Sequence, residues 1–261
     1  MKVGFLQFAP KLHHEQYNLD KISSMLSGCA ADLIVLPELC TSGYLFSSRD
    51  QMALLASPAN GRVPLFFQEL AHREQITIAA GFLESERNEF YNSQIVVSPE
   101  GEQIIYRKVH LFLDEKDLFQ PGNSGFKIYE LHTTKLGMMI CFDWIFPESV
   151  RTLALMGADI ICHSANLVLP FCQKAMITRS IENGVFTITA NRIGSDEIGD
   201  ECLNFTGMSQ VTDPKGHVLI QAGDDEEKVA FVNIDPEEAR NKYITDKNHL
   251  LDDRRKKFYK T

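Results

Sequence analysis

The sequence lacks an excess of positive charge. Its 26 Lys and Arg residues are outnumbered by 35 Asp and Glu residues, which gives a formal net charge of −9. Nucleic acids and anionic membrane surfaces both attract clustered Lys and Arg, so neither is expected as a partner. The basic run at 254–257 follows Asp252 and Asp253. It is therefore expected to be solvated or to contact another subunit.

The sequence also lacks long hydrophobic runs and closely spaced cysteines. No stretch approaches the roughly 18 consecutive apolar residues of a membrane span, and the apolar N-terminal segment is too short for a signal peptide. No C-x-x-C pair occurs among the cysteines, a pattern typical of a reducing compartment. They are Cys29, Cys40, Cys141, Cys162, Cys172 and Cys202. We therefore expect a soluble, cytoplasmic protein without disulfides.

What the sequence does contain is an alternation of strand-like and helix-like segments within 261 residues, a length that suits one α/β domain. Apolar strand patterns alternate with segments of helical periodicity at 63–75, 146–157 and 173–184. Hairpins are predicted at 92–109 and 209–219, where turn residues separate two strand patterns. Hairpins mixed with helices favour mixed sheets covered by helices, so the fold class is α/β.

Three ionisable residues follow or interrupt apolar strand patterns. Glu38 comes just after "DLIVLP", where partial desolvation raises the pKa of a carboxyl toward that of a general base. A helix cap or a loop carboxylate is the alternative. Lys108 interrupts the strand "IIYRKV", a pattern that by itself favours an outward-facing lysine over one paired with a carboxylate. Cys141 lies between the strand "LGMMI" and the helix start "FPES", a layout that exposes a nucleophile, although a single cysteine is more often structural.

Taken together, these segments resemble a known family. "LPELCTSGY", "YRKVHLF" and "CFDWIFPES", in this order, are similar to the three signature segments of the nitrilase superfamily, the carbon–nitrogen hydrolases. The resemblance continues to the "DRRKKFY" tail and is nearest to the short, single-domain branch with archaeal nitrilase-like and amidase members. It implies a four-layer α-β-β-α sandwich with two mixed sheets over 1–247. It also implies a C-terminal tail, 248–261, that contacts the partner in a homodimer.

The resemblance also implies roles for individual residues. Glu38 corresponds to the general base, Lys108 to the cation that stabilises the oxyanion, and Cys141 to the nucleophile. Glu115 corresponds to a second glutamate that positions the substrate and the lysine; a solvated loop carboxylate is the alternative. Further residues near the same strand ends are candidates for lining the substrate pocket, with core packing as the alternative for the aromatic ones: Tyr44, Phe142, Trp144, Asn166, Phe171 and Arg192.

The implied reaction is hydrolysis of a small aliphatic amide to a carboxylic acid and ammonia through a thioester on the cysteine. Nitriles and N-carbamoyl amines are alternative substrates, because the same three residues serve all three reactions. A Cys141–His110 dyad and an inactive binding or scaffold protein also remain open. A metal hydrolase is disfavoured, since the histidine-containing segments lack metal-ligand spacing, and no metal or other cofactor is expected.

Overall fold

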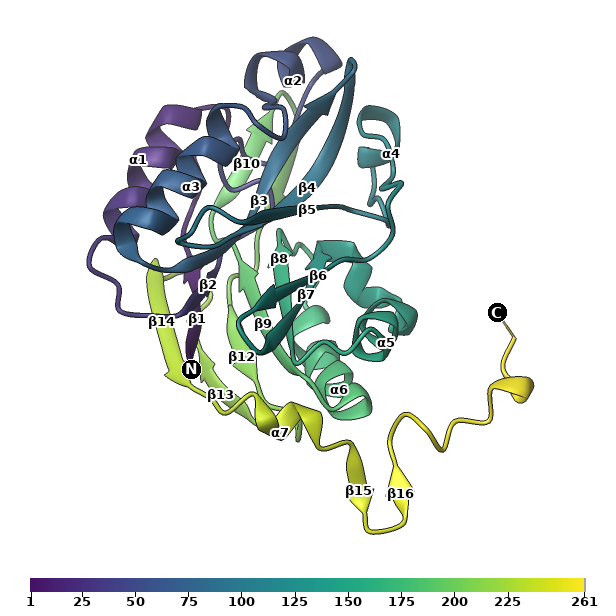
Figure 1. Cartoon of the computed structure of the whole chain (residues 1–261). Coiled ribbons are helices and arrows are strands. Elements are labelled where there is room, and N and C mark those ends of the chain that lie inside the picture. The colour runs from purple at the N-terminus through teal and green to yellow at the C-terminus, as the bar shows by residue number, and fades with distance from the viewer. Residues whose placement is uncertain (261) are drawn as a thin grey trace.

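The computed structural model describes residues 1–260, in which two six-stranded sheets pack face to face and helices cover both outer faces (Figure 1). The first sheet has the order β14-β1-β2-β3-β4-β5. Strands β1, β2 and β3 are parallel, whereas β14, β4 and β5 pair antiparallel with their neighbours. Its strands are β14 (Lys228–Asn233), β1 (Lys2–Gln7), β2 (Leu33–Val35), β3 (Thr77–Glu86), β4 (Glu89–Val97) and β5 (Gln103–Arg107).

The second sheet has the same plan, with the order β13-β12-β9-β8-β7-β6. Strands β9, β8 and β7 are parallel, and antiparallel strands flank them on both sides. The predicted mixed sheets and both predicted hairpins, β4–β5 and β12–β13, are therefore confirmed. The strands are β13 (Val218–Gln221), β12 (Gln210–Thr212), β9 (Phe186–Asn191), β8 (Ile160–Ala165), β7 (Thr134–Ile140) and β6 (Ile128–Leu131).

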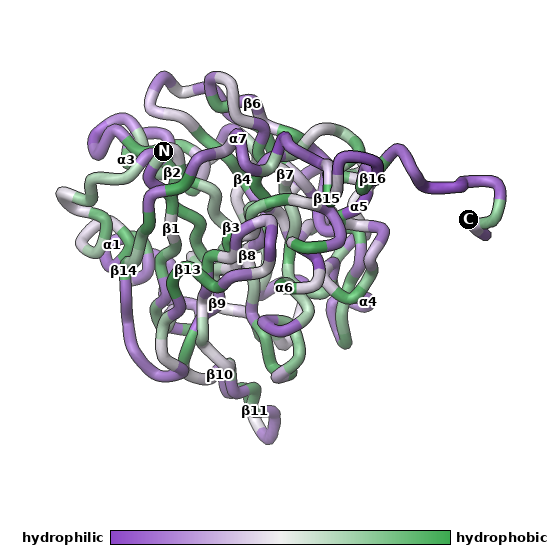
Figure 2. Tube along the Cα trace, turned by 90° about the horizontal axis from the view of Figure 1, so that it is seen from below, coloured by the Kyte–Doolittle hydropathy of each residue, from purple (hydrophilic) through white to green (hydrophobic). Residues whose placement is uncertain are grey.

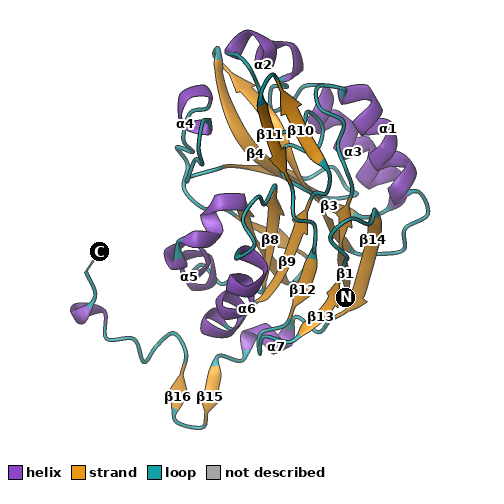
Figure 3. Ribbon diagram, turned by 180° about the vertical axis from the view of Figure 1, so that it is seen from behind, coloured by secondary structure: helices purple, strands orange, loops and turns teal. Residues whose placement is uncertain are grey.

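Two long helices cover each sheet. Figure 3 shows α1 and α3 together on one outer face and α5 and α6 on the other. These helices are α1 (Glu15–Leu26), α3 (Arg62–Glu74), α5 (Pro147–Leu155) and α6 (Cys172–Asn183). Proline begins α5, and Gly184 ends α6 in the left-handed conformation that favours glycine. The shorter elements are α2 (Arg49–Leu55), α4 (Glu115–Leu118), α7 (Glu237–Arg240), the 3-10 helices η1 (Cys141–Ile145) and η2 (Lys256–Phe258), and the hairpins β10–β11 (Ser195–Ile198, Glu201–Asn204) and β15–β16 (Tyr243–Thr245, Asn248–His249).

The sandwich follows from apolar residues on both faces of the central strands. In β2, Leu33 and Val35 belong to the core shared with the second sheet, while Ile34 packs with the helices on the outer face. All three side chains are fully buried. Since burial of one such side chain contributes about 1.5–3 kcal/mol, a strand that is apolar on both faces is stable only between two covered layers.

The end of the chain departs from the sandwich. After α7 the backbone forms the small β15–β16 hairpin and then extends away from the body (Figure 1). Figure 2 shows this last segment as mostly hydrophilic, with a short hydrophobic stretch near its end. The tail expected at 248–261 thus begins inside the hairpin, at β16; Thr261 lies outside the described residues. Within residues 1–260, no helix has both the length and the apolar character needed to span a bilayer.

A close backbone approach fixes the segment after β2. Gly81 in β3 donates its N–H to the Pro37 carbonyl over 3.1 Å, and its carbonyl accepts a hydrogen bond from the Cys40 N–H. A Cβ at this position would lie 2.5 Å from the Glu38 Cα and 2.7 Å from the Leu39 nitrogen. Only glycine therefore lets the segment that carries Glu38 lie against the sheet.

We expect Gly81→Ala to lower the free energy of unfolding by about 1–3 kcal/mol, because the new methyl group meets backbone that cannot move aside. Urea unfolding followed by circular dichroism measures the change. Gly223→Ala is the matched control, since its Cβ would meet the Glu226 side chain at 3.4 Å, an ordinary contact. Equal stability of the two variants would contradict the steric argument.

Candidate active site

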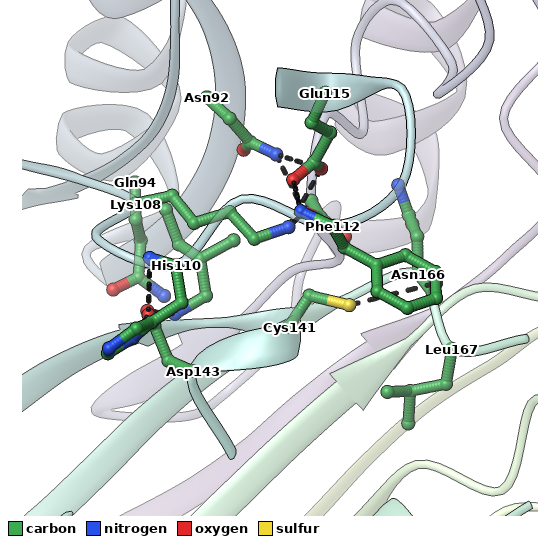
Figure 4. A network of polar contacts seen from close by, with 12 residues as sticks. Asn92, Gln94, Lys108, His110, Phe112, Glu115, Cys141, Asp143, Asn166 and Leu167 are labelled. Atoms are coloured by element: carbon green, nitrogen blue, oxygen red, sulfur yellow. Dashed lines mark hydrogen bonds and ion pairs between the residues drawn. The ribbon is translucent and has the colours of Figure 1, made fainter. Parts of the chain in front are cut away.

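Three charged side chains meet inside the sandwich. The Lys108 Nζ lies 2.6 Å from the Glu38 Oε1 and 2.8 Å from the Glu115 Oε1. All three residues are buried, with relative exposures of 1%, 0% and 4%. Figure 4 shows Lys108 and Glu115 with the Cys141 thiol beside them. The prediction that Lys108 faces outward is wrong. The lysine is buried, and the two carboxylates compensate its charge.

Each of these residues lies at the end of a strand or at the start of a helix. Glu38 follows β2 through Pro37, and the Leu39 backbone beyond it has φ +45°. Lys108 comes directly after β5, and its N–H continues the ladder by donating to the Asn92 carbonyl over 2.8 Å. Glu115 is the first residue of α4. Residues far apart in sequence are thus brought together by the ends of β2 and β5 and by one short helix.

The two glutamates differ in their hydrogen bonding. The Glu115 Oε1 accepts from Lys108 and from the Asn92 amide, and its Oε2 accepts from the Phe112 N–H over 2.7 Å. The Glu38 Oε1 likewise accepts from Lys108 and Asn92. No side chain or backbone group within residues 1–260 bonds to the buried Glu38 Oε2. Within the described part of the chain, Glu38 thus has a carboxylate oxygen that accepts no hydrogen bond, whereas both Glu115 oxygens accept at least one.

The electrostatics of the cluster fit this difference. Burial raises the pKa of Glu38, the Lys108 charge lowers it and the Glu115 charge raises it again, which leaves the pKa at about 7. Burial lowers the pKa of Lys108, but the negative charges of Glu115 and Glu38 raise it by more. The pKa of Lys108 is therefore above its ordinary value. Burial raises the pKa of the Cys141 thiol well above 9. Near neutral pH the cluster therefore combines a charged lysine, a glutamate able to exchange a proton and a neutral thiol.

Cys141 occupies a strained turn. It is the first residue of η1, directly after β7, and its φ of +37° is unusual for a residue with a side chain. Its Sγ lies 3.8 Å from the Asn166 carbonyl, at the end of β8. A sharp turn between a strand and a helix presents the thiol to the cleft and leaves the Phe142 N–H, in the first turn of η1, without a partner inside the helix.

Two residues that the sequence did not mark hold this turn. His163 in β8 is fully buried, and its Nε2 lies 3.1 Å from the Cys141 carbonyl while its Nδ1 lies 3.1 Å from the Thr189 hydroxyl. Burial lowers the pKa of His163 to about 4, so the ring is neutral and donates from Nε2 to the Cys141 carbonyl. Asp143 bonds the turn from the other side, since its Oδ2 accepts the Ile140 N–H over 3.0 Å.

Asp143 also determines the position of His110. The His110 Nδ1 lies 2.7 Å from the Asp143 Oδ1, and the ring stacks on Phe146 with centroids 3.9 Å apart. The Tyr106 hydroxyl donates to the other Asp143 oxygen over 2.7 Å. Figure 4 shows His110 directed at Asp143, on the side away from the thiol. The structure thus gives no support to a Cys141–His110 dyad.

A mainly apolar hollow lies in front of the thiol. Asn166 supplies a polar side chain, which is 3% exposed and has no hydrogen-bond partner for its amide within residues 1–260. Three of the predicted substrate-binding residues, Phe142, Trp144 and Asn166, thus lie beside Cys141. The full lining is Phe112, Cys141, Phe142, Trp144, Asn166, Leu167, Val168 and Leu169.

Tyr44 lies near the charged cluster but outside that hollow. Burial raises the pKa of its hydroxyl, and the neighbouring charges of Glu115, Glu38 and Cys141 raise it further. Its ring packs edge-on against Phe205. Tyr44 therefore lies close to the cluster, and its role as a substrate-binding residue stays a prediction.

Arg192 and Phe171 are placed away from the hollow. Arg192 is fully buried, pairs with Asp196 over 2.8 Å and lies over the Phe205 ring. The same Asp196 oxygen accepts the Tyr44 N–H over 2.7 Å, so Arg192 supports the Tyr44 loop and does not line the hollow. Phe171 caps the start of α6 and is 59% exposed. Both positions differ from the predicted pocket lining.

Comparisons with known proteins agree with this geometry. The family model described as carbon-nitrogen hydrolase matches residues 2–243. The chain belongs to the carbon–nitrogen hydrolase family. It is 42% identical to a nitrilase from Pyrococcus abyssi over 99% of both chains, and 32% identical to an (R)-stereoselective amidase from a Pseudomonas species over 96% of this chain and 93% of the relative.

The fold comparison gives the same family. A carbon-nitrogen hydrolase structure from Helicobacter pylori superposes with a TM-score of 0.89 at 26% identity, covering 99% of this chain and 97% of the other. The predicted nitrilase-superfamily membership and α-β-β-α fold are confirmed. Relatives named nitrilase and amidase both match, so the chain is a carbon–nitrogen hydrolase. Within residues 1–260, no three His, Cys, Asp or Glu side chains gather as a metal site.

We expect His110→Ala to leave the rate and pH dependence of Cys141 alkylation unchanged, because the imidazole bonds to Asp143 and not to the thiol. Stability should fall by about 1 kcal/mol through the lost hydrogen bond. Iodoacetamide labelling followed by intact mass spectrometry measures the first effect and urea unfolding the second. A fall of about a hundredfold in the alkylation rate would instead support the dyad.

Proposed function

We propose that this carbon–nitrogen hydrolase is a cytoplasmic amidase that converts small aliphatic amides to carboxylic acids and ammonia. The observation that supports it best is the buried Glu38–Lys108–Glu115 cluster beside Cys141, with one unbonded oxygen on Glu38. Amides are poor electrophiles, and a thiol splits their hydrolysis into two easier steps. The free, widely separated cysteines fit a reducing compartment.

In the first half of the reaction, the Glu38 Oε2 takes the Cys141 proton as the sulfur attacks the amide carbon. Negative charge then grows on the substrate oxygen. An ammonium group has three N–H donors, and Lys108 uses two of them on the glutamates, so the third remains for this oxygen together with the Phe142 N–H. Each such donor contributes about 3–4 kcal/mol to stabilising the transition state.

In the second half, the tetrahedral intermediate collapses and the leaving nitrogen takes the proton from Glu38, which releases ammonia and leaves a thioester on Cys141. Glu38 then removes a proton from a water molecule that attacks the thioester carbon. The acid is released, and Cys141 recovers its proton. Glu38 thus acts as base and acid in turn, a role suited to a carboxyl with a pKa of about 7.

The substrate-facing groups proposed here are Tyr44, Phe142, Trp144 and Asn166. The hollow beside Cys141 is mainly apolar, which suits an aliphatic acyl group. A nitrile is the second candidate substrate, because the 42% identical relative is named a nitrilase. N-carbamoyl amines are a further alternative that uses the same catalytic groups.

We expect wild type to release ammonia from at least one member of a panel of small aliphatic amides, N-carbamoyl amines, ω-amides of keto acids and aliphatic nitriles. Cys141→Ala should lower that turnover by about 10⁴-fold or more, since the nucleophile is removed. Cys172→Ala is a matched control, because Cys172 is also buried but lies at the start of α6. If the wild-type protein released no ammonia from any compound in the panel, the result would contradict the proposal and favour a non-catalytic member of the fold.

We also propose that the active form is a homodimer in which the tail, 248–261, contacts the partner. The tail and the helices α5 and α6, which cover the second sheet, expose large apolar side chains that a monomer leaves in water. Phe171, Leu155 and Ile181 are exposed on or beside α5 and α6, and Phe258 and Tyr259 near the end of the chain.

We expect sedimentation of wild type to give a dimer, and a chain ending at Lys247 to give a monomer, because the truncation removes the exposed aromatic residues of the tail. Leu54→Ser is the matched control: Leu54 is 84% exposed on α2, on a different part of the surface, and its loss should leave the dimer intact. A fully active monomer of the wild-type chain at low concentration would overturn the dimer.

A further inference from the structure

A neutral side chain bonds to the same carboxylate oxygens as the catalytic lysine. The Asn92 Nδ2 donates to the Glu38 Oε1 over 2.7 Å and to the Glu115 Oε1 over 3.0 Å, and Figure 4 shows it facing Glu115 and the lysine. We propose that Asn92 is a positioning residue that fixes Glu38 in the orientation for proton transfer. This inference rests on the proposed function, in which Glu38 is the base.

Asn92 lies in the first sheet and pairs directly with Lys108 through the backbone. It lies in β4, is fully buried, and pairs with Leu83 of β3. Its backbone carbonyl accepts the Lys108 N–H over 2.8 Å. The two donors are therefore tied to each other through the backbone, and each reaches both carboxylates. The result is a closed square of two donors and two acceptor oxygens.

The arrangement determines which Glu38 oxygen is available. Asn92 and Lys108 both bind Oε1, and Oε2 is left free. Without the Asn92 amide, the Glu38 carboxyl is held by Lys108 alone. It can then turn about its terminal bond, so that either oxygen faces the Cys141 thiol. Asn92 removes that freedom, because its second hydrogen is already fixed on Glu115.

A neutral donor is needed here because of the charge balance. Glu38 and Glu115 share one cation in a buried site, and a second cation would hold Glu38 ionised and weaken it as an acid. An amide stabilises the ionised carboxyl through a hydrogen bond without adding charge. The bond from Asn92 lowers the pKa of Glu38 against the burial and the Glu115 charge that raise it.

The bonds to both glutamates use the amide nitrogen of Asn92 and leave its amide oxygen without a partner among the described residues. The Asn92 Oδ1 is buried and bonds to no group within residues 1–260. The reverse orientation of the amide would set this oxygen against two carboxylates, so the unpaired oxygen is a consequence of holding the glutamates. A leucine of similar size would avoid this unpaired atom, but it would take a donor from both carboxylates, so the bonds to Glu38 and Glu115 account for an amide at this position.

The test compares Asn92→Leu and Asn92→Asp with wild type in the pH dependence of kcat/KM and of Cys141 alkylation by iodoacetamide. We expect kcat to fall by about tenfold to a hundredfold with little change in KM, because the base is misaligned. The acid limb of both pH profiles should move to higher pH in both variants, since the Asn92 hydrogen bond that lowers the pKa of Glu38 is lost. Asn92→Asp should move it further, because it adds a third carboxyl.

Gln94→Leu is the matched control. Gln94 lies two residues along β4 on the same face and is fully buried, but its Nε2 donates to the Ser164 hydroxyl over 2.8 Å and to the Cys162 carbonyl over 3.1 Å. It links the two sheets and touches neither glutamate. Its substitution should lower stability and leave the acid limb unmoved.

Glu38→Gln separates the inference from the proposed function. If Glu38→Gln abolishes the acid limb while both Asn92 variants keep the wild-type limb and kcat, the role of Asn92 is overturned and the base assignment stands. If Glu38→Gln leaves the limb and the alkylation profile unchanged, the proposed mechanism fails and the inference fails with it. Asn92→Asp, nearly identical in shape to the native side chain, keeps the test valid if Asn92→Leu does not fold.

Discussion

The structure depends on one buried ion cluster, the Lys108 ammonium between the Glu38 and Glu115 carboxylates. Burying three charges is unfavourable unless each finds partners, and loss of one partner from such a cluster typically costs about 3–5 kcal/mol. The partners here come from the ends of β2 and β5 and from α4, with Asn92 of β4 completing the set. The loops at this end of the sandwich are therefore fixed by the same contacts that form the candidate site.

The fold was largely readable from the sequence because its signals are local. The central strands are apolar on both faces, Pro99–Gly101 supplies a hairpin turn, and Gly184 ends α6. What escaped prediction depends on contacts distant in sequence or on unusual turn residues. The β3–β4 hairpin turns at Arg87 and Asn88, both with positive φ, where glycine is the usual signal, and the β10–β11 hairpin is short and polar.

In the candidate site too, features that depend on local sequence could be predicted and features that depend on distant contacts could not. The motif residues follow or begin regular elements, so their positions could be inferred, and their roles came from family resemblance. The burial of Lys108 could not be inferred, because it depends on Glu115 and Glu38 arriving from elsewhere in the chain. Arg192 was misplaced for a similar reason, since its partner Asp196 draws it away from the hollow. Asn92 and His163 carried no signal, because a buried amide or imidazole in a strand looks like ordinary core.

The raised pKa of the Cys141 thiol affects how readily this cysteine is oxidised. Peroxide oxidises thiolates far faster than thiols, and the usual low-pKa catalytic cysteine is exposed to that damage whenever the enzyme is idle. Here burial keeps the sulfur protonated, and in the proposed mechanism it loses its proton only when Glu38 accepts it. The resting site is thus protected from oxidation by the same neutrality that makes its base necessary.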